Sequence, residues 1–262
     1  MRKKIKYFLF IIASTILFCC SSPATKYENA IDESKTCSMI FIDKSVSVNP
    51  SKQFIYEKYT KIINELIDEN IKVKGDKIEV FFIHENTAKA KVAELVARSE
   101  MEIAEGTSAT DAEAQKTEFA MEIGKERSIF KKVVITHLTS QNTSTSKNNT
   151  DIQAALPLID HEIGKGFKVK AYFLSDMVES MSGTNRRDFH KTPPVDDAAA
   201  VGWAREDAAR LQSVLPNISM AEIFIAKPFE PTASRKLNNP AISTYWQRLF
   251  SELGVSTEVK EL

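Results

Sequence analysis

Short apolar runs alternate with longer amphipathic segments along most of this chain, and this alternation limits its possible folds more than any other feature. The apolar runs predict strands over residues 37–42, 77–83, 167–174 and 218–226. Apolar residues at helical spacing predict helices over residues 51–70, 151–163, 206–215 and 242–253. Right-handed helical crossovers place successive strands parallel to one another in one sheet. The expected fold is therefore α/β and doubly wound, with a mostly parallel central sheet and helices on both of its faces.

The segment between the second strand and Thr150 is expected to be rich in helix, from Thr87 to about Leu138. Apolar residues between Phe119 and Leu138 fall close to one face of such a helix. Val133–Ile135 could instead form an edge strand, and periodicity leaves both possibilities open. Residues 139–150 are polar throughout, which is typical of a loop that is either functional or mobile.

Composition removes several classes of fold and function. With only 8 Gly and 9 Pro, the chain has few residues for the repeated turns of an antiparallel sandwich or barrel. A hydrophobic share of 43% and a charged share of 27% are typical of a globular protein. The four histidines, at positions 84, 137, 161 and 190, lack the spacing of a zinc site, and no glycine-rich phosphate loop is present. One folded domain is expected over residues 37–262.

The N-terminus has the pattern of a targeting segment. Residues 1–6 are basic, residues 7–18 are apolar but short for a membrane span, and Cys19 and Cys20 follow directly. This pattern resembles a bacterial lipoprotein signal peptide, which implies cleavage after residue 19, lipidation of Cys20 and a polar tether over residues 20–36. Cleavage before Cys19 would place the bulky Phe18 at the preceding position, and an uncleaved signal anchor is the other alternative.

Processing at Cys20 changes the charge balance of the chain. Four of the 35 basic residues and none of the 35 acidic residues lie within residues 1–19, so the remainder carries 31 against 35, a net charge of −4. A mildly acidic chain lacks the basic surface of a nucleic-acid binder. Only Cys20 and Cys37 then remain, so no disulfide framework is expected, and Cys37 is expected to pack as a small buried residue.

Oxygen-bearing side chains lie at the predicted ends of strands and at one loop end. Asp43, Ser45 and Ser47 follow the first strand, Thr150 ends the polar loop, and Asp176 follows the strand of residues 167–174. Hard oxygen ligands of this kind suit Mg²⁺, Mn²⁺ or Ca²⁺. In parallel α/β sheets, ligands bind beyond the carboxyl ends of the strands, where these residues would converge. Asp43, Ser47 and Thr150 could alternatively cap the helices that follow them.

The ordered combination of Asp43-x-Ser45-x-Ser47, Thr150 and Asp176 resembles the metal-ion-dependent adhesion site of von Willebrand factor A domains, over roughly residues 37–253. The resemblance implies that the hydroxyls of Ser45, Ser47 and Thr150 bind a cation directly or through water. Asp43 and Asp176 would act largely through bridging waters, and one position on the metal would stay open for a carboxylate of a protein partner. Lys44 is expected to point away from this cation.

Two positions depart from the pattern of that family. Asn148 and Asn149 stand where many members have glycines before the threonine, and Met177 follows Asp176 where many members have glycine. Asparagine tolerates left-handed backbone well, so the first difference is mild. Met177 is the larger departure, because a side chain at this position bears on the backbone geometry that follows Asp176.

The sequence therefore predicts a lipid-anchored binding module of the cell envelope, not an enzyme, with Mg²⁺ or Mn²⁺ as the cofactor and Ca²⁺ as a further candidate. Its partners would be the membrane, through the lipid, and a protein that offers an acidic group to the metal. Attachment to the outer membrane, facing the periplasm, is the expected location, with surface display as the alternative. A metal-assisted envelope hydrolase and a metal-free scaffold are the competing hypotheses.

Overall fold

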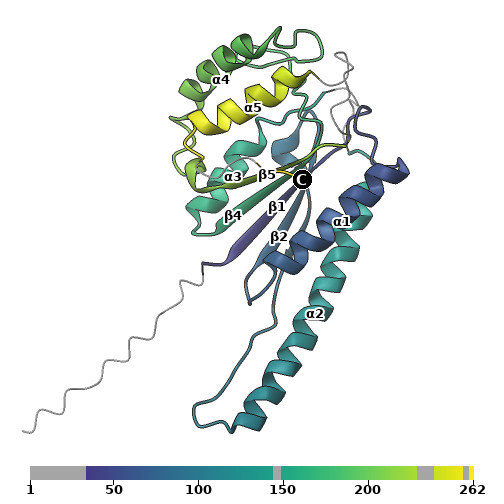
Figure 1. The fold of residues 1–262 in the computed structure, drawn as a ribbon, viewed down its shortest axis with the longest axis vertical. Helices are drawn as coiled ribbons and strands as arrows, with labels where there is room; N and C mark the ends of the chain where they lie inside the picture. Colours follow the sequence, from purple (N-terminus) through teal and green to yellow (C-terminus); the bar gives the residue numbers. More distant parts are fainter. Residues whose placement is uncertain (1–33, 144–148, 229–238, 256–259) are drawn as a thin grey trace, which may run out of the picture. The chain divides into compact units, whose positions relative to one another are not determined.

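The computed structural model describes residues 34–143, 149–228, 239–255 and 260–262, and a six-stranded sheet lies at its centre (Figure 1). The signal peptide, Cys20 and most of the tether lie outside the described residues. The strands are β1 (Thr36–Asp43), β2 (Lys77–Ile83), β3 (Lys91–Val96), β4 (Lys168–Leu174), β5 (Glu222–Ala226) and β6 (Lys260–Glu261). Their order across the sheet is β3-β2-β1-β4-β5-β6, and every neighbouring pair is parallel except β2 with β3.

Helices cover both faces of this sheet, as Figure 1 shows. The five α-helices are α1 (Gln53–Asn70), α2 (Ala109–Thr139), α3 (Ala155–Gly164), α4 (Asp197–Leu211) and α5 (Pro240–Glu252). Two hydrophobic clusters follow this division, one beneath α3, α4 and α5 and the other beneath α1 and α2. No helix in the described part of the chain is both long and apolar enough to cross a membrane.

The central strands are buried because both of their faces meet helices. Successive residues of a strand point to opposite faces, so Phe41 joins the cluster under α3 to α5 while Ile40 and Ile42 join the other. The ring of Phe41 stacks between Phe81 and Phe173, with centroids 5.2 and 5.0 Å away. A near-continuous apolar run is the expected sequence for such a strand.

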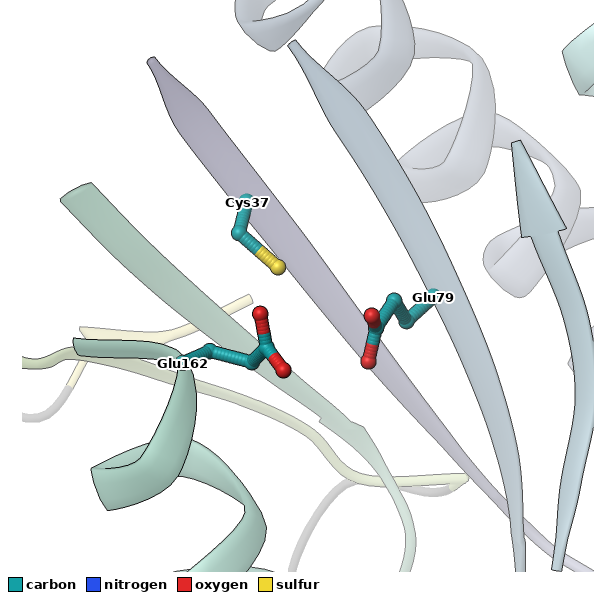
Figure 2. A group of neighbouring side chains, drawn as sticks. All are labelled: Cys37, Glu79 and Glu162. Carbon is teal, nitrogen blue, oxygen red and sulfur yellow. The ribbon is translucent and has the colours of Figure 1, made fainter. Parts of the chain in front are cut away.

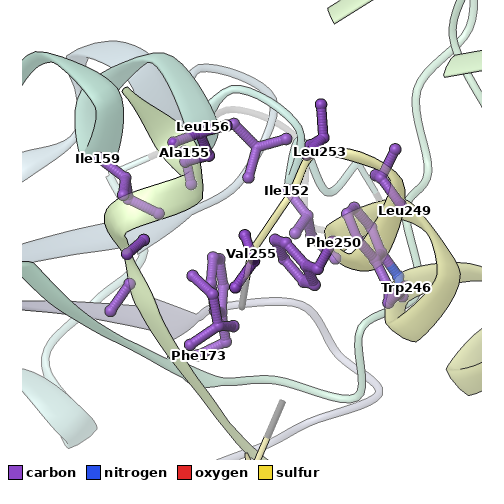
Figure 3. Close-up of a cluster of buried hydrophobic side chains, with 14 of the residues drawn as sticks. Ile152, Ala155, Leu156, Ile159, Phe173, Trp246, Leu249, Phe250, Leu253 and Val255 are labelled. Carbon is purple, nitrogen blue, oxygen red and sulfur yellow. The ribbon is translucent and has the colours of Figure 1, made fainter. Parts of the chain in front are cut away.

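The last helix closes the core on the side of α3. Trp246, Leu249 and Phe250 are fully buried and pack toward Ile152 and Phe173 in the cluster drawn in Figure 3. The indole Nε1 of Trp246 donates to the carbonyl of Met177, 2.7 Å away. These residues of α5 therefore form part of the core.

The predicted fold class is confirmed, and the main correction falls in the segment expected to be rich in helix. Residues 87–89 form a single 3₁₀ turn, and β3 follows as an antiparallel edge strand before α2 begins. Val133–Ile135 lies inside α2, which settles the possibility of a strand there.

Several predicted boundaries also shift. The helix expected from residue 151 begins at Ala155, because residues 151–154 form a turn, and the helix expected from residue 206 already begins at Asp197. The strand expected over residues 218–226 is shorter, since a 3₁₀ turn at Ile218–Met220 precedes β5.

Candidate metal centre

The predicted metal residues lie where the order of strands in the sheet reverses. From β1 the chain first adds β2 on one side and later β4 on the other, so the crevice between the carboxyl ends of β1 and β4 is the switch point. Ile42 pairs with Leu174 in this parallel ladder. Asp43 follows Ile42 and Asp176 stands two residues after Leu174, so the topology brings both carboxylates to one edge of the sheet.

Asp43 is fully buried and its carboxylate is held by hydrogen bonds on both oxygens. The backbone N–H of Ser45 donates to Oδ1 at 2.8 Å, and the hydroxyl of Ser175 donates to Oδ2 at 2.6 Å. Ser175 in turn accepts a hydrogen bond from the N–H of Met177 at 2.9 Å. Ser175 thus links the two aspartate loops, and sequence analysis missed it although it directly precedes Asp176.

The two serines complete one side of the cluster. The hydroxyls of Ser45 and Ser47 lie 2.9 Å apart, and Ser47 hydrogen-bonds the carboxylate of Asp176. The alternative that Asp43 and Ser47 cap the next helix is wrong, because α1 begins at Gln53 and its N-cap residue, Lys52, caps without a side-chain bond. Four of the five predicted metal residues therefore form one connected group.

Thr150 is almost fully buried and is held by its backbone near the same edge. Its N–H donates to the carbonyl of Ser180 at 3.4 Å, and its carbonyl accepts from the N–H of Ser180 at 2.9 Å. The following N–H, of Asp151, donates to the carbonyl of His84, directly after β2. Asp151, not Thr150, caps the turn that leads into α3, because its Oδ1 accepts from the N–H of Ala154 at 3.0 Å. Asn148, the other residue singled out before Thr150, lies outside the described residues.

A buried ion-paired group that sequence analysis missed supports this threonine loop. Glu179 is fully buried, and its Oε2 accepts from the N–H groups of Ile152 and Gln153 at 2.7 and 3.2 Å. Arg186 donates to both Asp151 and Glu179. The guanidinium of Arg186 therefore ties the loop after Asp176 to the loop after Thr150.

Burial, and next the charge of Asp176, raise the pKa of Asp43 to about 7. Burial also raises the pKa of Asp176 and outweighs the charge of His190, which lowers it. Within the described residues neither carboxylate forms a salt bridge. Two neighbouring carboxylates in a buried site repel each other, and a bound cation would remove that repulsion. The donor set of carboxylates and hydroxyls fits a hard divalent cation.

Lys44 lies between two of the site residues in sequence but turns away from them, as expected. Its Nζ donates to the carbonyls of His137, Leu138 and Ser140 at the end of α2, at 2.7 to 2.9 Å. The ammonium also lies 4.5 Å from the centroid of the Phe82 ring. Lys44 therefore satisfies helix-terminal carbonyls and leaves the carboxylates to another cation.

Met177 keeps the backbone conformation that a glycine would adopt. Its φ is +61°, in the left-handed region, and its side chain is buried. This conformation costs a residue with a Cβ about 1 to 2 kcal/mol. The hydrogen bonds of its N–H to Ser175 and of its carbonyl to Trp246 hold the turn in place. The departure from the family pattern thus leaves the turn after Asp176 intact.

Two pockets open beside the cluster. One, of about 550 Å³, lies between the Ser45 loop and the residues that follow α2, and the exposed side chain of Val46 forms part of its wall. The other, of about 440 Å³, is lined by Asn149, Ser180, Asp188, His190 and Lys191. Ser45 lines the first pocket, and the second is lined by neighbours of Thr150 and not by the five predicted metal residues.

A second group of possible ligand atoms lies near the amino ends of the strands. Cys37 from β1, Glu79 from β2 and Glu162 from α3 point toward one another in Figure 2, with ligand atoms within 4.8 Å. Lys77 already fills this group, with its Nζ 2.8 Å from Glu79 and 2.5 Å from Glu162. Burial raises the pKa of Cys37, so the thiol stays protonated. Cys37 is buried as predicted, but among ionic side chains.

His84, directly after β2, is buried. It is 5% exposed, and its Nδ1 accepts from the N–H of Asn86 at 3.0 Å. Burial lowers its pKa. The ring therefore belongs to the packed end of β2.

Comparison with known proteins gives likenesses of structure alone. No protein-family model matches this chain, and no curated protein matches it. Proximal thread matrix protein 1 from the mussel byssus is 10% identical with a TM-score of 0.35, and the match covers 84% of this chain and 48% of that chain. A von Willebrand factor type A protein from Catenulispora acidiphila is 13% identical with a TM-score of 0.37, covering 84% of this chain and 42% of that one.

The human COPII-coat protein Sec24c is 9% identical with a TM-score of 0.41, and the match covers 87% of this chain and 30% of that chain. This chain therefore matches less than half the length of each of the three structures.

Proposed function

We propose that this protein is a lipid-anchored binding module of the cell envelope in which a divalent cation captures an acidic group of a protein partner. The residues that would hold the cation are Asp43, Ser45, Ser47, Thr150 and Asp176. One observation carries the proposal: two neighbouring carboxylates stand at the switch point of the sheet with no salt bridge in the described residues. Mg²⁺ and Mn²⁺ fit this donor set best, and Ca²⁺ also takes oxygen ligands.

The side chains around the site support binding of a partner. Ser175 fixes the orientation of the Asp43 carboxylate, while Lys44 is engaged by α2 and does not compete for it. When bound, the cation would supply the attraction for a carboxylate oxygen of the partner. The pocket that Ser45 lines leaves room for the residues that flank such a carboxylate.

Titration calorimetry of Mg²⁺ and then Mn²⁺ into the full chain tests the site. Saturable binding is expected for the wild type and should be lost in Asp43→Ala and Thr150→Ala. Asp68→Ala is the matched control, because Asp68 is an exposed carboxylate that pairs with Lys131. Unchanged binding in Asp43→Ala, or no metal response in the wild type, would contradict the proposal.

The lipid anchor is tested separately by metabolic labelling with a radioactive fatty acid. The pattern of residues 1–20 supports labelling at Cys20, so Cys20→Ser should abolish it and release the protein from membranes. Cys37→Ser is the control, because Cys37 is buried in the folded domain and should leave labelling unchanged.

A further inference from the structure

Most of the first half of α2 extends beyond the hydrophobic core. The buried residues of α2 are Ile123, Phe130, Val134 and Leu138, so none of them falls in the first fourteen residues of the helix. At 1.5 Å per residue, that unburied portion is about 21 Å long. Figure 1 shows it running past the strands. Phe119, in the last turn of this half, is partly buried against the cluster beneath α1 and α2, and the turns before it extend past the core.

Local interactions nevertheless define this helix start. The hydroxyl of Ser108 accepts from the N–H of Asp111 at 3.2 Å and donates to the Asp111 carboxylate at 2.7 Å. Residues 109–122 are rich in Ala and Glu, which favour helix. An isolated helix of this length is only marginally stable in water. The sequence thus maintains a helical extension that contacts the core mainly through Phe119.

The extension is strongly acidic. Residues 99–122, which we name the acidic arm, contain seven acidic residues and Lys116 as their single basic residue, a net charge of −6. Residues 20–262 as a whole carry −4, so the remainder of that chain is net positive. The seven acidic residues are Glu100, Glu102, Glu105, Asp111, Glu113, Glu118 and Glu122. The acidic arm therefore attracts cationic groups.

Apolar side chains are exposed among these charges. Met101, Ile103 and Met121 of the acidic arm are 49%, 42% and 58% exposed. Ile129, farther along α2, is 59% exposed. Met121 and Ile129 are eight residues apart, about two turns or 12 Å, on the side of α2 that faces away from its buried residues. Methionine adapts its shape to different apolar partners.

We propose that the acidic arm, with Ile129, is a docking surface for a basic amphipathic helix of a partner protein. Apolar residues two turns apart on the partner match the spacing of Met121 and Ile129, and its lysines or arginines face the surrounding carboxylates. Charge complementarity selects this occupant. A second copy of the chain would bring −6 against −6, and an anionic lipid surface would repel the acidic arm.

The test measures fluorescence anisotropy of a labelled amphipathic Leu/Lys peptide of about five helical turns, titrated with the full chain in EDTA. EDTA keeps this surface separate from the candidate metal centre. Saturable binding is expected, and it should weaken about tenfold in Met121→Ser/Ile129→Ser and in Glu118→Lys/Glu122→Lys. Circular dichroism checks that α2 stays helical in both variants.

Two control variants make the same kinds of substitution outside the acidic arm. Glu57→Lys/Glu65→Lys reverses two exposed charges two turns apart on α1, and Val214→Ser removes an exposed apolar side chain. Both controls should bind the peptide as the wild type does. Hydrogen exchange should slow in residues 109–122 when the peptide binds. Equal affinity in arm and control variants, or no saturable binding, would overturn the proposal.

Two further measurements distinguish the other occupants. Sedimentation that shows a dimer lost in Met121→Ser/Ile129→Ser would assign the surface to a second copy. Flotation with phosphatidylglycerol vesicles that requires the acidic arm would assign it to lipid. Either result would overturn the proposal, whereas a monomer that ignores the vesicles and binds the peptide would support it.

Discussion

The two ends of the parallel sheet each gather carboxylates, but only one end neutralises them. At the amino end, Lys77 lies between Glu79 and Glu162 in a buried ionic group. At the carboxyl end, Asp43 and Asp176 approach each other with hydroxyls around them and no salt bridge in the described residues. Buried charge is costly unless it is compensated. The amino end therefore carries its own counter-ion, whereas the donor set at the carboxyl end fits a divalent cation from solution.

The largest expected effect comes from removing the internal counter-ion. Lys77→Met preserves volume but leaves Glu79 and Glu162 without the ammonium between them, so the free energy of unfolding should fall by about 3 kcal/mol. Urea denaturation measures it. Lys165→Met is the control, because Lys165 pairs with Glu162 from a half-exposed position and should cost less than about 1 kcal/mol. Equal losses would remove the distinction between the two ends.

Lys77→Met should also give the amino end of the sheet a metal response like the one proposed for the carboxyl end. Without Lys77, the Cys37 thiol and the two carboxylates form a group of ligand atoms whose remaining counter-ions are the half-exposed Lys91, on Glu79, and Lys165, on Glu162. Thiolate and carboxylate together favour Zn²⁺. Zn²⁺ should therefore raise the melting temperature of Lys77→Met and leave that end of the wild type unaffected.

A second variant tests the ion pair beside the candidate metal centre. Arg186→Met leaves Glu179 buried with only its two backbone donors, and the free energy of unfolding should fall by about 2 kcal/mol. Metal binding measured by calorimetry should weaken as well, because Asp151 directly follows Thr150. Arg205→Met is the control, since Arg205 pairs with Glu252 at the surface and should cost about 0.5 kcal/mol or less. Unchanged metal affinity in Arg186→Met would separate this ion pair from the site.

The sequence predicted the parts of the fold that long periodic segments determine. Strands β1, β2 and β4 each contain four consecutive apolar residues, at 39–42, 80–83 and 171–174. Strand β3 was missed because Lys91 and Glu94 leave it no apolar run longer than two residues, at an exposed sheet edge. The first half of α4 was missed because it packs through small residues, Ala200 and Ala204, which carry little hydrophobic signal.

The candidate site was predictable to the extent that strand ends determine it. Asp43 and Asp176 follow neighbouring strands, so topology alone brings them together. Arg186 meets Asp151 across 35 residues, and Lys77 meets Glu162 across 85. Such pairings depend on how loops and helices pack, which no local spacing encodes.

Metal binding at the carboxyl end of the sheet should stabilise the folded protein. At a free Mn²⁺ concentration ten times the dissociation constant, binding should stabilise the wild type by about 1.4 kcal/mol. Asp43→Asn should lose this gain, and in EDTA it should be at least as stable as the wild type, because it removes one of two repelling buried charges. Thermal unfolding with and without Mn²⁺ measures both effects. Asp68→Asn should respond to Mn²⁺ as the wild type does, and a retained response in Asp43→Asn would refute the assignment.

The smallest expected effect is a difference in response to mild acid. The ion pair of Lys77 and Glu162 stays charged there, because hydrogen bonds outweigh burial and hold the pKa of Lys77 above, and that of Glu162 below, their usual values. At the other end, burial lowers the pKa of His84, whose Nδ1 must be unprotonated to accept from Asn86. A folded-state pKa below the unfolded value of about 6.5 gives stability that is present above pH 6.5 and is lost as the pH falls.

His84→Gln should therefore lose less stability than the wild type between pH 7.5 and 5.5, by a difference of less than about 1 kcal/mol. Denaturation in EDTA at both pH values measures this, and comparing the two proteins cancels the titration of the carboxylates that they share. Parallel pH profiles would show that His84 is not sensitive to acid, and the contrast between the two ends would then rest on their carboxylates alone.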